Sequence, residues 1–250
     1  MSLQLGVERV FLERKSEILP LTGLRGVAVL IVILGHYLIW CAPYDGNQTP
    51  QFIIRACSTT DAGMTLFFTL SGFVIAYNYL GFDWHGRPLG SAIDFVYLRL
   101  SRLYPAYLLF FLIAVRRIPA DYPLKASILN FFSMQSWYPL KIDGVLPFAG
   151  GYAINWSIST EIGMYLIFVG WVALCSRFRA KRWLALWLSG IVIVILGLAA
   201  AFYADHLAAF LNRLPIASQP TIPTDMAMWF FYLSPFFRFV DFLFGSPQRW

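Results

Sequence analysis

A nearly unbroken apolar segment, Leu19–Trp40, most constrains what this chain can fold into. A helix needs about 20 consecutive apolar residues to cross a bilayer, and this segment has that length. More apolar stretches follow, and 59% of the 250 residues are hydrophobic whereas only 13% are charged. Soluble domains carry about a quarter charged residues. The chain is therefore predicted to be an integral membrane protein.

The predicted fold class is an all-α polytopic transmembrane helical bundle with about six spans. Five stretches have the required length, and a sixth contains Arg238 and Asp241 and should face protein rather than lipid. A further stretch, Ser127–Leu140, is interrupted by polar residues and contains Pro139, so we expect an interfacial or re-entrant helix there. The expected spans are Leu21–Trp40, Ala62–Leu80, a helix from near Ile93 to Val115, Tyr152–Cys175, Trp183–Tyr203 and Met226–Gly245.

The basic residues indicate an orientation. With six spans and a cytoplasmic N-terminus, the stretches Gly81–Arg102 and Ser176–Arg182 both lie in the cytoplasm, as the positive-inside rule favours. This topology signal explains the formal charge of +6 without nucleic acid as a partner. We expect a cytoplasmic segment at 1–20, a membrane domain at 21–245 and a short tail at 246–250.

Two ionisable residues, Arg25 and His36, lie inside the first apolar segment. They are eleven positions apart, so on a helix they share one face about 16 Å apart. An ionisable group at bilayer depth costs roughly 2.5–3.5 kcal/mol on insertion scales, and a functional role is the default hypothesis. The alternative is an arginine that snorkels to the interface and a histidine that is hydrogen-bonded between helices.

A second polar set lies in the fourth expected span. Ser157, Glu161 and Tyr165 follow one another at four-residue spacing and so line one helix face. Counted from opposite membrane surfaces, Glu161 is about 13 Å deep and His36 about 22 Å deep, so in a core about 30 Å thick their depths can coincide. Glu161 would then fix the tautomer of His36, which suits the imidazole to take a proton from a hydroxyl. The alternative is a structural tie between helices.

Arg99 and Arg102, three residues apart, present two forked donors on one helix face. At a cytoplasmic helix end they could bind the phosphates of a coenzyme, and a positive-inside anchor at lipid headgroups is the alternative. No metal site is expected, because His36, His85 and His206 lie far apart in this topology.

Four segments resemble, in order, motifs of the acyltransferase-3 family of integral membrane acyltransferases. The family's "LDGLRG…H" segment is matched by LTGLRGVAVLIVILGH, its "GVDLFFVLSGF" segment by GMTLFFTLSGFVIAY, its "RxxRIYP" segment by FVYLRLSRLYPAYLL and its "WSLSVE…YL" segment by NWSISTEIGMYLIF. The resemblance runs from about Glu17 to Gly245. Thr22 and Thr65 stand where the family commonly has Asp.

The resemblance implies an enzyme that transfers an acyl group, commonly acetyl from cytoplasmic acetyl-CoA, to a hydroxyl of a carbohydrate or lipid-linked cell-envelope acceptor. It implies no permanently bound cofactor; the expected partners are acyl-CoA, the acceptor and membrane lipid. The expected location is a bacterial inner membrane with the N-terminus in the cytoplasm. The expected catalytic residues are His36 and Glu161, and the expected donor- or substrate-binding residues are Arg25, Arg99 and Arg102, which match the family motifs, with Ser157 and Tyr165 on the face of Glu161.

Family members typically have about ten spans and continue beyond the region that resembles Phe237–Gly245. The chain is therefore expected to be a shortened member, and a non-catalytic truncated paralogue is one alternative to an active enzyme. A proton-coupled transporter is another, because buried His, Arg and Glu residues also form proton relays. The sequence shows neither inverted repeats nor paired broken helices, which disfavours a transporter.

Overall fold

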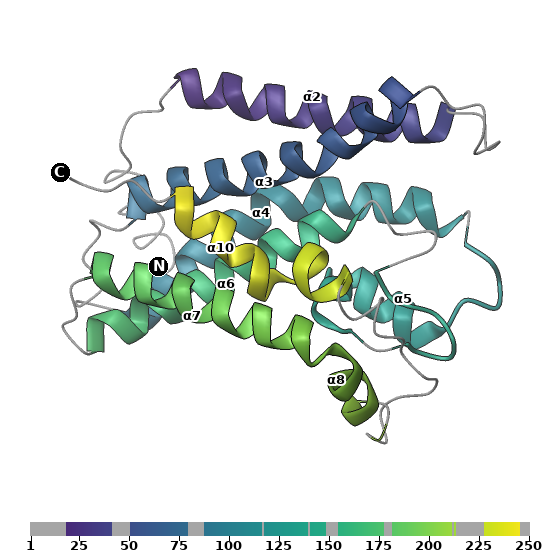
Figure 1. Ribbon diagram of the computed structural model, residues 1–250. Coiled ribbons are helices and arrows are strands. Elements are labelled where there is room, and N and C mark those ends of the chain that lie inside the picture. The colour runs from purple at the N-terminus through teal and green to yellow at the C-terminus, as the bar shows by residue number, and fades with distance from the viewer. Residues whose placement is uncertain are drawn as a thin grey trace. The chain divides into compact units, whose positions relative to one another are not determined.

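The computed structural model describes residues 19–41, 51–79, 88–116, 118–139, 141–148, 155–177, 182–211, 213 and 228–245. Helices dominate this part of the chain, and it contains no β-strand, only an isolated bridge between Ile142 and Val145 (Figure 1). The all-α class is therefore confirmed. The expected tail at 246–250 and all but the last two residues of the expected N-terminal segment lie outside the described residues.

Within the described residues, four helices are long and apolar enough to cross a membrane. They correspond to the first four expected spans, and the apolar part of the third begins at Ala92, next to the expected start at Ile93. Their composition fits an integral membrane protein. These helices are α2 (Leu19–Cys41), α3 (Gln51–Tyr79), α4 (Pro88–Val115) and α6 (Trp156–Arg177).

The fifth expected span is not confirmed. Helix α7 (Arg182–Phe202) lies where this span was expected, but the apolar stretch described within it is only Gly190–Ala199. Helix α7 as a whole is 21 residues long. The short helix α8 (Ala204–Leu211) follows.

The sixth expected span is divided into two pieces. A π-helical turn, η3 (Trp229–Leu233), precedes α10 (Pro235–Gly245), and Ser234 between them is extended, with φ −71° and ψ 137°. The proline ring of Pro235 explains this break, because it disfavours a helical conformation of the preceding residue.

The segment expected not to cross the membrane forms two short pieces, α5 (Leu124–Phe131) and the 3₁₀ turn η1 (Gln135–Trp137). An eight-residue helix is about 12 Å long, too short for a core about 30 Å thick. The side chains of Asn130 and Gln135 are fully buried, as is Ser133 between these two pieces. The opposite face of α5 carries the exposed apolar residues Leu124, Ile128 and Phe131, so both expected forms, interfacial and re-entrant, fit this segment.

The chain divides into two compact units. The smaller unit comprises the described residues of Arg14–Phe82 and Asp241–Trp250, and in it α2 lies along α3 (Figure 1). The larger unit comprises the described residues of Asp83–Val240. Within this larger unit, α4 and α6 are in contact, and η1 packs against α6.

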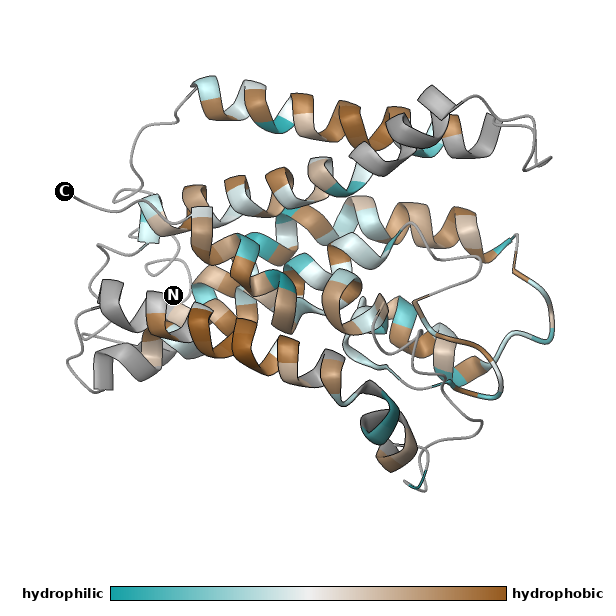
Figure 2. Ribbon diagram, viewed as in Figure 1, coloured by the Kyte–Doolittle hydropathy of each residue, from teal (hydrophilic) through white to brown (hydrophobic). Residues whose placement is uncertain are grey.

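Large apolar side chains point outward on several helices. Figure 2 shows hydrophobic residues along α2, and the same is true of the described part of α7. Extended apolar surface is unusual for a soluble monomer, whereas helices that face lipid require it. Exposed examples are Leu30 and Leu34 of α2, Leu109 and Phe110 of α4, and Ile195 and Leu196 of α7.

Candidate functional site

Arg25 of α2 is held by the neighbouring helix α3 within the smaller unit. Its Nη2 donates a hydrogen bond of 2.9 Å to Ser71 Oγ, and its guanidinium lies over the ring of Phe67, 5.3 Å from the centroid. Phe67 and Ser71 are four residues apart, so α3 offers a ring and a hydroxyl from one face. The guanidinium is thus held against α3.

His36 of α2 is oriented by its own helix. Its Nδ1 lies 2.8 Å from the backbone carbonyl oxygen of Val32, one turn earlier. A carbonyl oxygen can only accept, so the proton of this hydrogen bond is assigned to Nδ1. In the neutral ring the lone pair is then on Nε2, which is the nitrogen available to take a proton.

The close approach of α2 and α3 fixes the position of His36. A Cβ atom at Gly35 would overlap the hydroxyl of Thr60 on α3, so any larger residue at this crossing point requires the Thr60 side chain to turn away. Small residues allow helix backbones to approach in this way within membranes. The half-buried His36 follows directly after this contact.

Glu161 lies in the larger unit on α6 and is 3% exposed. The hydroxyl of Tyr165, one turn later, donates a hydrogen bond of 2.5 Å to Glu161 Oε1. The four-residue spacing predicted a shared face, and for these two residues the hydrogen bond confirms it. Ser157, one turn earlier, is half-buried. The predicted contact between Glu161 and His36 joins residues of the two units and stays a prediction.

The two arginines of α4 differ in their surroundings. Arg99 is half-buried, and its guanidinium lies 5.6 Å from the ring centroid of Phe95 and 5.8 Å from that of Tyr165. Arg102 is exposed. The structure therefore brings Arg99 against the ring of Tyr165, whose hydroxyl binds Glu161, whereas Arg102 is exposed. Sequence reasoning missed Phe95, whose only signal is its position one turn before Arg99.

A buried hydroxyl cluster links η1 to the start of α6. Ser136 Oγ lies 2.7 Å from Ser159 Oγ and 3.1 Å from Thr160 Oγ1. These three residues are fully buried. Thr160 Oγ1 also lies 2.5 Å from the carbonyl oxygen of Leu233. Hydroxyl partners of this kind allow non-helical backbone to be buried without a loss of hydrogen bonds.

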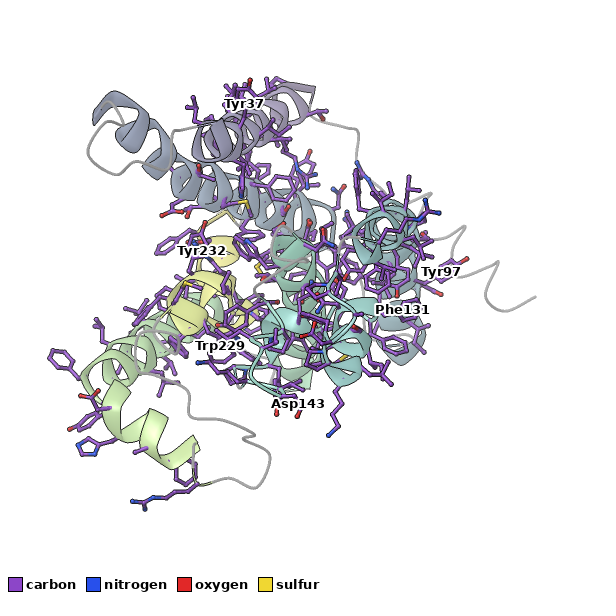
Figure 3. The ribbon with its side chains drawn as sticks, turned by 90° about the vertical axis from the view of Figure 1, so that its right-hand side faces the viewer. Tyr37, Tyr97, Phe131, Asp143, Trp229 and Tyr232 are labelled. Atoms are coloured by element: carbon purple, nitrogen blue, oxygen red, sulfur yellow. The ribbon has the colours of Figure 1, made fainter. Side chains whose placement is uncertain are left out.

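Two tryptophan side chains complete this hydroxyl cluster. Trp137 Nε1 donates to the carbonyl oxygen of Ser159 at 2.9 Å, and Trp229 Nε1 donates to that of Ser136 at 2.7 Å. Trp229 and Tyr232 both lie on η3 (Figure 3). Sequence analysis did not identify this cluster, although polar residues within an otherwise apolar stretch were its available signal.

The histidine, the carboxylate and the arginines described above each permit a particular kind of chemistry. A histidine with Nδ1–H bound to a carbonyl is oriented as a general base through Nε2. A buried carboxylate with a phenol donor is suited to stabilise positive charge, and arginine forks are suited to bind phosphate.

The comparisons with known proteins agree with the four motifs. A family model for an acyltransferase domain, acyltransferase 3, matches residues 19–244. The chain is 26% identical over 235 residues to acyltransferase MdmB of Streptomyces mycarofaciens. The aligned region covers 90% of this chain and 55% of MdmB. The chain thus spans about half the length of this relative. No solved structure matches it. From the family match across its described helices, we conclude that this chain belongs to the acyltransferase-3 family.

Proposed function

We propose that the protein is a membrane-embedded acyltransferase that moves an acyl group, acetyl in the first instance, from cytoplasmic acyl-CoA to a hydroxyl of a carbohydrate or lipid-linked cell-envelope acceptor. Family membership supports acyl transfer, and the apolar helices support a membrane setting. One observation carries the catalytic part of the proposal: the Nδ1 of His36 is bound to the Val32 carbonyl, which leaves Nε2 for the acceptor.

In the proposed reaction, Nε2 of His36 takes the proton of the acceptor hydroxyl as its oxygen attacks the thioester carbonyl carbon. The carbon–sulfur bond of the donor then breaks, and His36 returns the proton to the sulfur of coenzyme A. The Val32 carbonyl keeps the ring oriented throughout and stabilises the imidazolium that forms transiently. General base catalysis of this kind contributes about 10²–10⁴-fold to the rate.

The other predicted residues receive roles from their chemistry. Arg99 and Arg102 are proposed to bind the phosphates of the donor, and Arg25 to polarise its thioester. Glu161 is proposed, from its expected depth in the membrane, to stabilise the imidazolium of His36. Ser157, one turn before Glu161, is proposed to contact the substrate.

The test is transfer of label from radioactive acetyl-CoA to carbohydrate and lipid fractions in membranes that contain the protein. His36→Ala is expected to lower transfer at least about 100-fold, since the general base is lost. The matched control is His206→Ala, because His206 is an exposed histidine of α8. Undiminished transfer by His36→Ala, or no transfer by the wild-type protein, would contradict the proposal.

A further inference from the structure

Tyr165 contacts two of the three charged groups that the larger unit contributes to the proposed site. Its hydroxyl binds Glu161, and the face of its ring lies beneath the guanidinium of Arg99. We infer that Tyr165 is a positioning residue that holds Glu161 through its hydroxyl and Arg99 through its ring. This inference rests on the proposed function, in which Glu161 serves the base and Arg99 serves the donor.

The hydroxyl of Tyr165 orients the carboxylate of Glu161. Glu161 is nearly inaccessible to solvent, and a buried carboxylate requires donors from the protein to replace those of water. Tyr165 supplies such a donor from the next turn of the same helix, at 2.5 Å from Oε1. Hydrogen bonds to charged acceptors are about twice as strong as neutral ones, so this contact orients the Glu161 side chain as well as stabilising its charge.

The ring of Tyr165 helps to hold the guanidinium of Arg99 in place. The guanidinium of Arg99 faces two rings, that of Phe95 on its own helix and that of Tyr165 on α6. The two rings meet edge to face, with centroids 6.0 Å apart and planes at 81°. Phe95 is also packed against Phe168, 5.7 Å between centroids. All three rings are buried, so they form a rigid support for the charged end of Arg99.

These two contacts use different parts of one side chain and can be separated by substitution. Tyr165→Phe removes the hydroxyl and keeps the ring, so it should disturb Glu161 and leave Arg99 in place. Phe95→Leu weakens the support of Arg99 without removing any group that binds Glu161. The matched control is Tyr97→Phe, because Tyr97 is an exposed tyrosine of α4 (Figure 3).

The experiment measures kcat and the KM for acetyl-CoA, normalised to the amount of folded protein in detergent. Tyr165→Phe is expected to lower kcat about tenfold, since a hydrogen bond to a charged group is lost, and to leave KM within about twofold. Phe95→Leu is expected to raise KM roughly threefold with little change in kcat. Tyr97→Phe should match the wild-type protein in both constants.

A purely structural role for Tyr165 would lower the yield of folded protein and leave both constants unchanged. That result, or a Tyr165→Phe variant that changes KM alone, would overturn the inference while leaving the proposed function intact if His36→Ala is inactive. A wild-type protein without transfer would overturn both. If Phe95→Leu does not fold, Tyr165→Phe still decides the hydroxyl contact, and a comparison of Tyr165→Leu with Tyr165→Phe decides the ring contact.

Discussion

The proton on Nδ1 of His36 is bound by the carbonyl oxygen of Val32, which belongs to the backbone of the same helix. A substitution of another side chain cannot remove this acceptor. The ring should therefore keep its tautomer when Glu161 is altered. In the proposed reaction, Glu161 then contributes charge stabilisation rather than orientation, and its loss should cost less than the loss of His36 itself.

We expect Glu161→Gln to lower kcat roughly tenfold, against at least about 100-fold for His36→Ala. If the two residues act together, Glu161→Gln should cause little further loss in the background of His36→Ala, because coupled residues are not additive. The measurement is residual acetyl transfer by the three variants. If the fold-losses of acetyl transfer in the two single variants multiply in the double variant, the predicted pairing of His36 with Glu161 is contradicted.

Part of this residue-scale picture was predictable from the sequence. The spacing of Glu161 and Tyr165 predicts a shared helix face, because a helix has a fixed period. The tautomer of His36 was not predictable, because every helical residue has a carbonyl one turn before it, and only the rotamer of the ring decides whether that carbonyl is used. Nor does the spacing of Arg99 and Arg102 reveal that only Arg99 lies against the ring of Tyr165.

At the scale of the elements, α6 depends on a close contact at Gly163, two residues after Glu161. A Cβ atom at this position would lie 2.5 Å from Cβ of Pro235 and 3.0 Å from Nε1 of Trp137. The proline ring would have to move, and the tryptophan would have to give by a few tenths of an ångström. Gly170, on the same helix, has no atom within 4 Å of the corresponding position.

We therefore expect opposite effects from the same substitution at two glycines of α6. Gly163→Ala should lower the thermal unfolding temperature in detergent by several degrees, since overpacking costs about 1–3 kcal/mol. Gly170→Ala should leave it unchanged or raise it slightly, because alanine has the higher helix propensity. Equal melting temperatures for the two variants would show that the contact at Gly163 is not tight.

The elements that the sequence predicts best are the long apolar ones. The first four spans and the extension of the third to Ala92 follow from apolar length alone. The division of the sixth follows from Pro235, a local signal that length counting ignores. The turn at Gln135–Trp137 could not be placed in advance, because its long-range hydrogen bonds reach residues 20 to 93 positions away, such as Asn155 and Trp229.

At the scale of the whole molecule, the distribution of basic residues predicts which side of the membrane each connection occupies. With a cytoplasmic N-terminus, the chain is outside after three crossings, near Pro119, and inside after four, near Arg182. We expect alkaline phosphatase fused at Pro119 to be active in a bacterial host and the same enzyme fused at Arg182 to be inactive. Green fluorescent protein should fluoresce when fused at Arg182 and not when fused at Pro119. If both reporters give the opposite result at the two positions, the N-terminus lies outside.

The bond from Trp229 to the carbonyl of Ser136 has a consequence for synthesis in the membrane. These two residues are 93 positions apart, and Thr160 reaches Leu233 across 73. The ribosome must therefore deliver η3 before the turn at Gln135–Trp137 can acquire its last partners. Until then, water or the insertion machinery must donate a hydrogen bond to the carbonyl oxygen of Ser136. The formation of the hydrogen bond between Trp229 and Ser136 is thus expected to be among the latest events in the biogenesis of the larger unit.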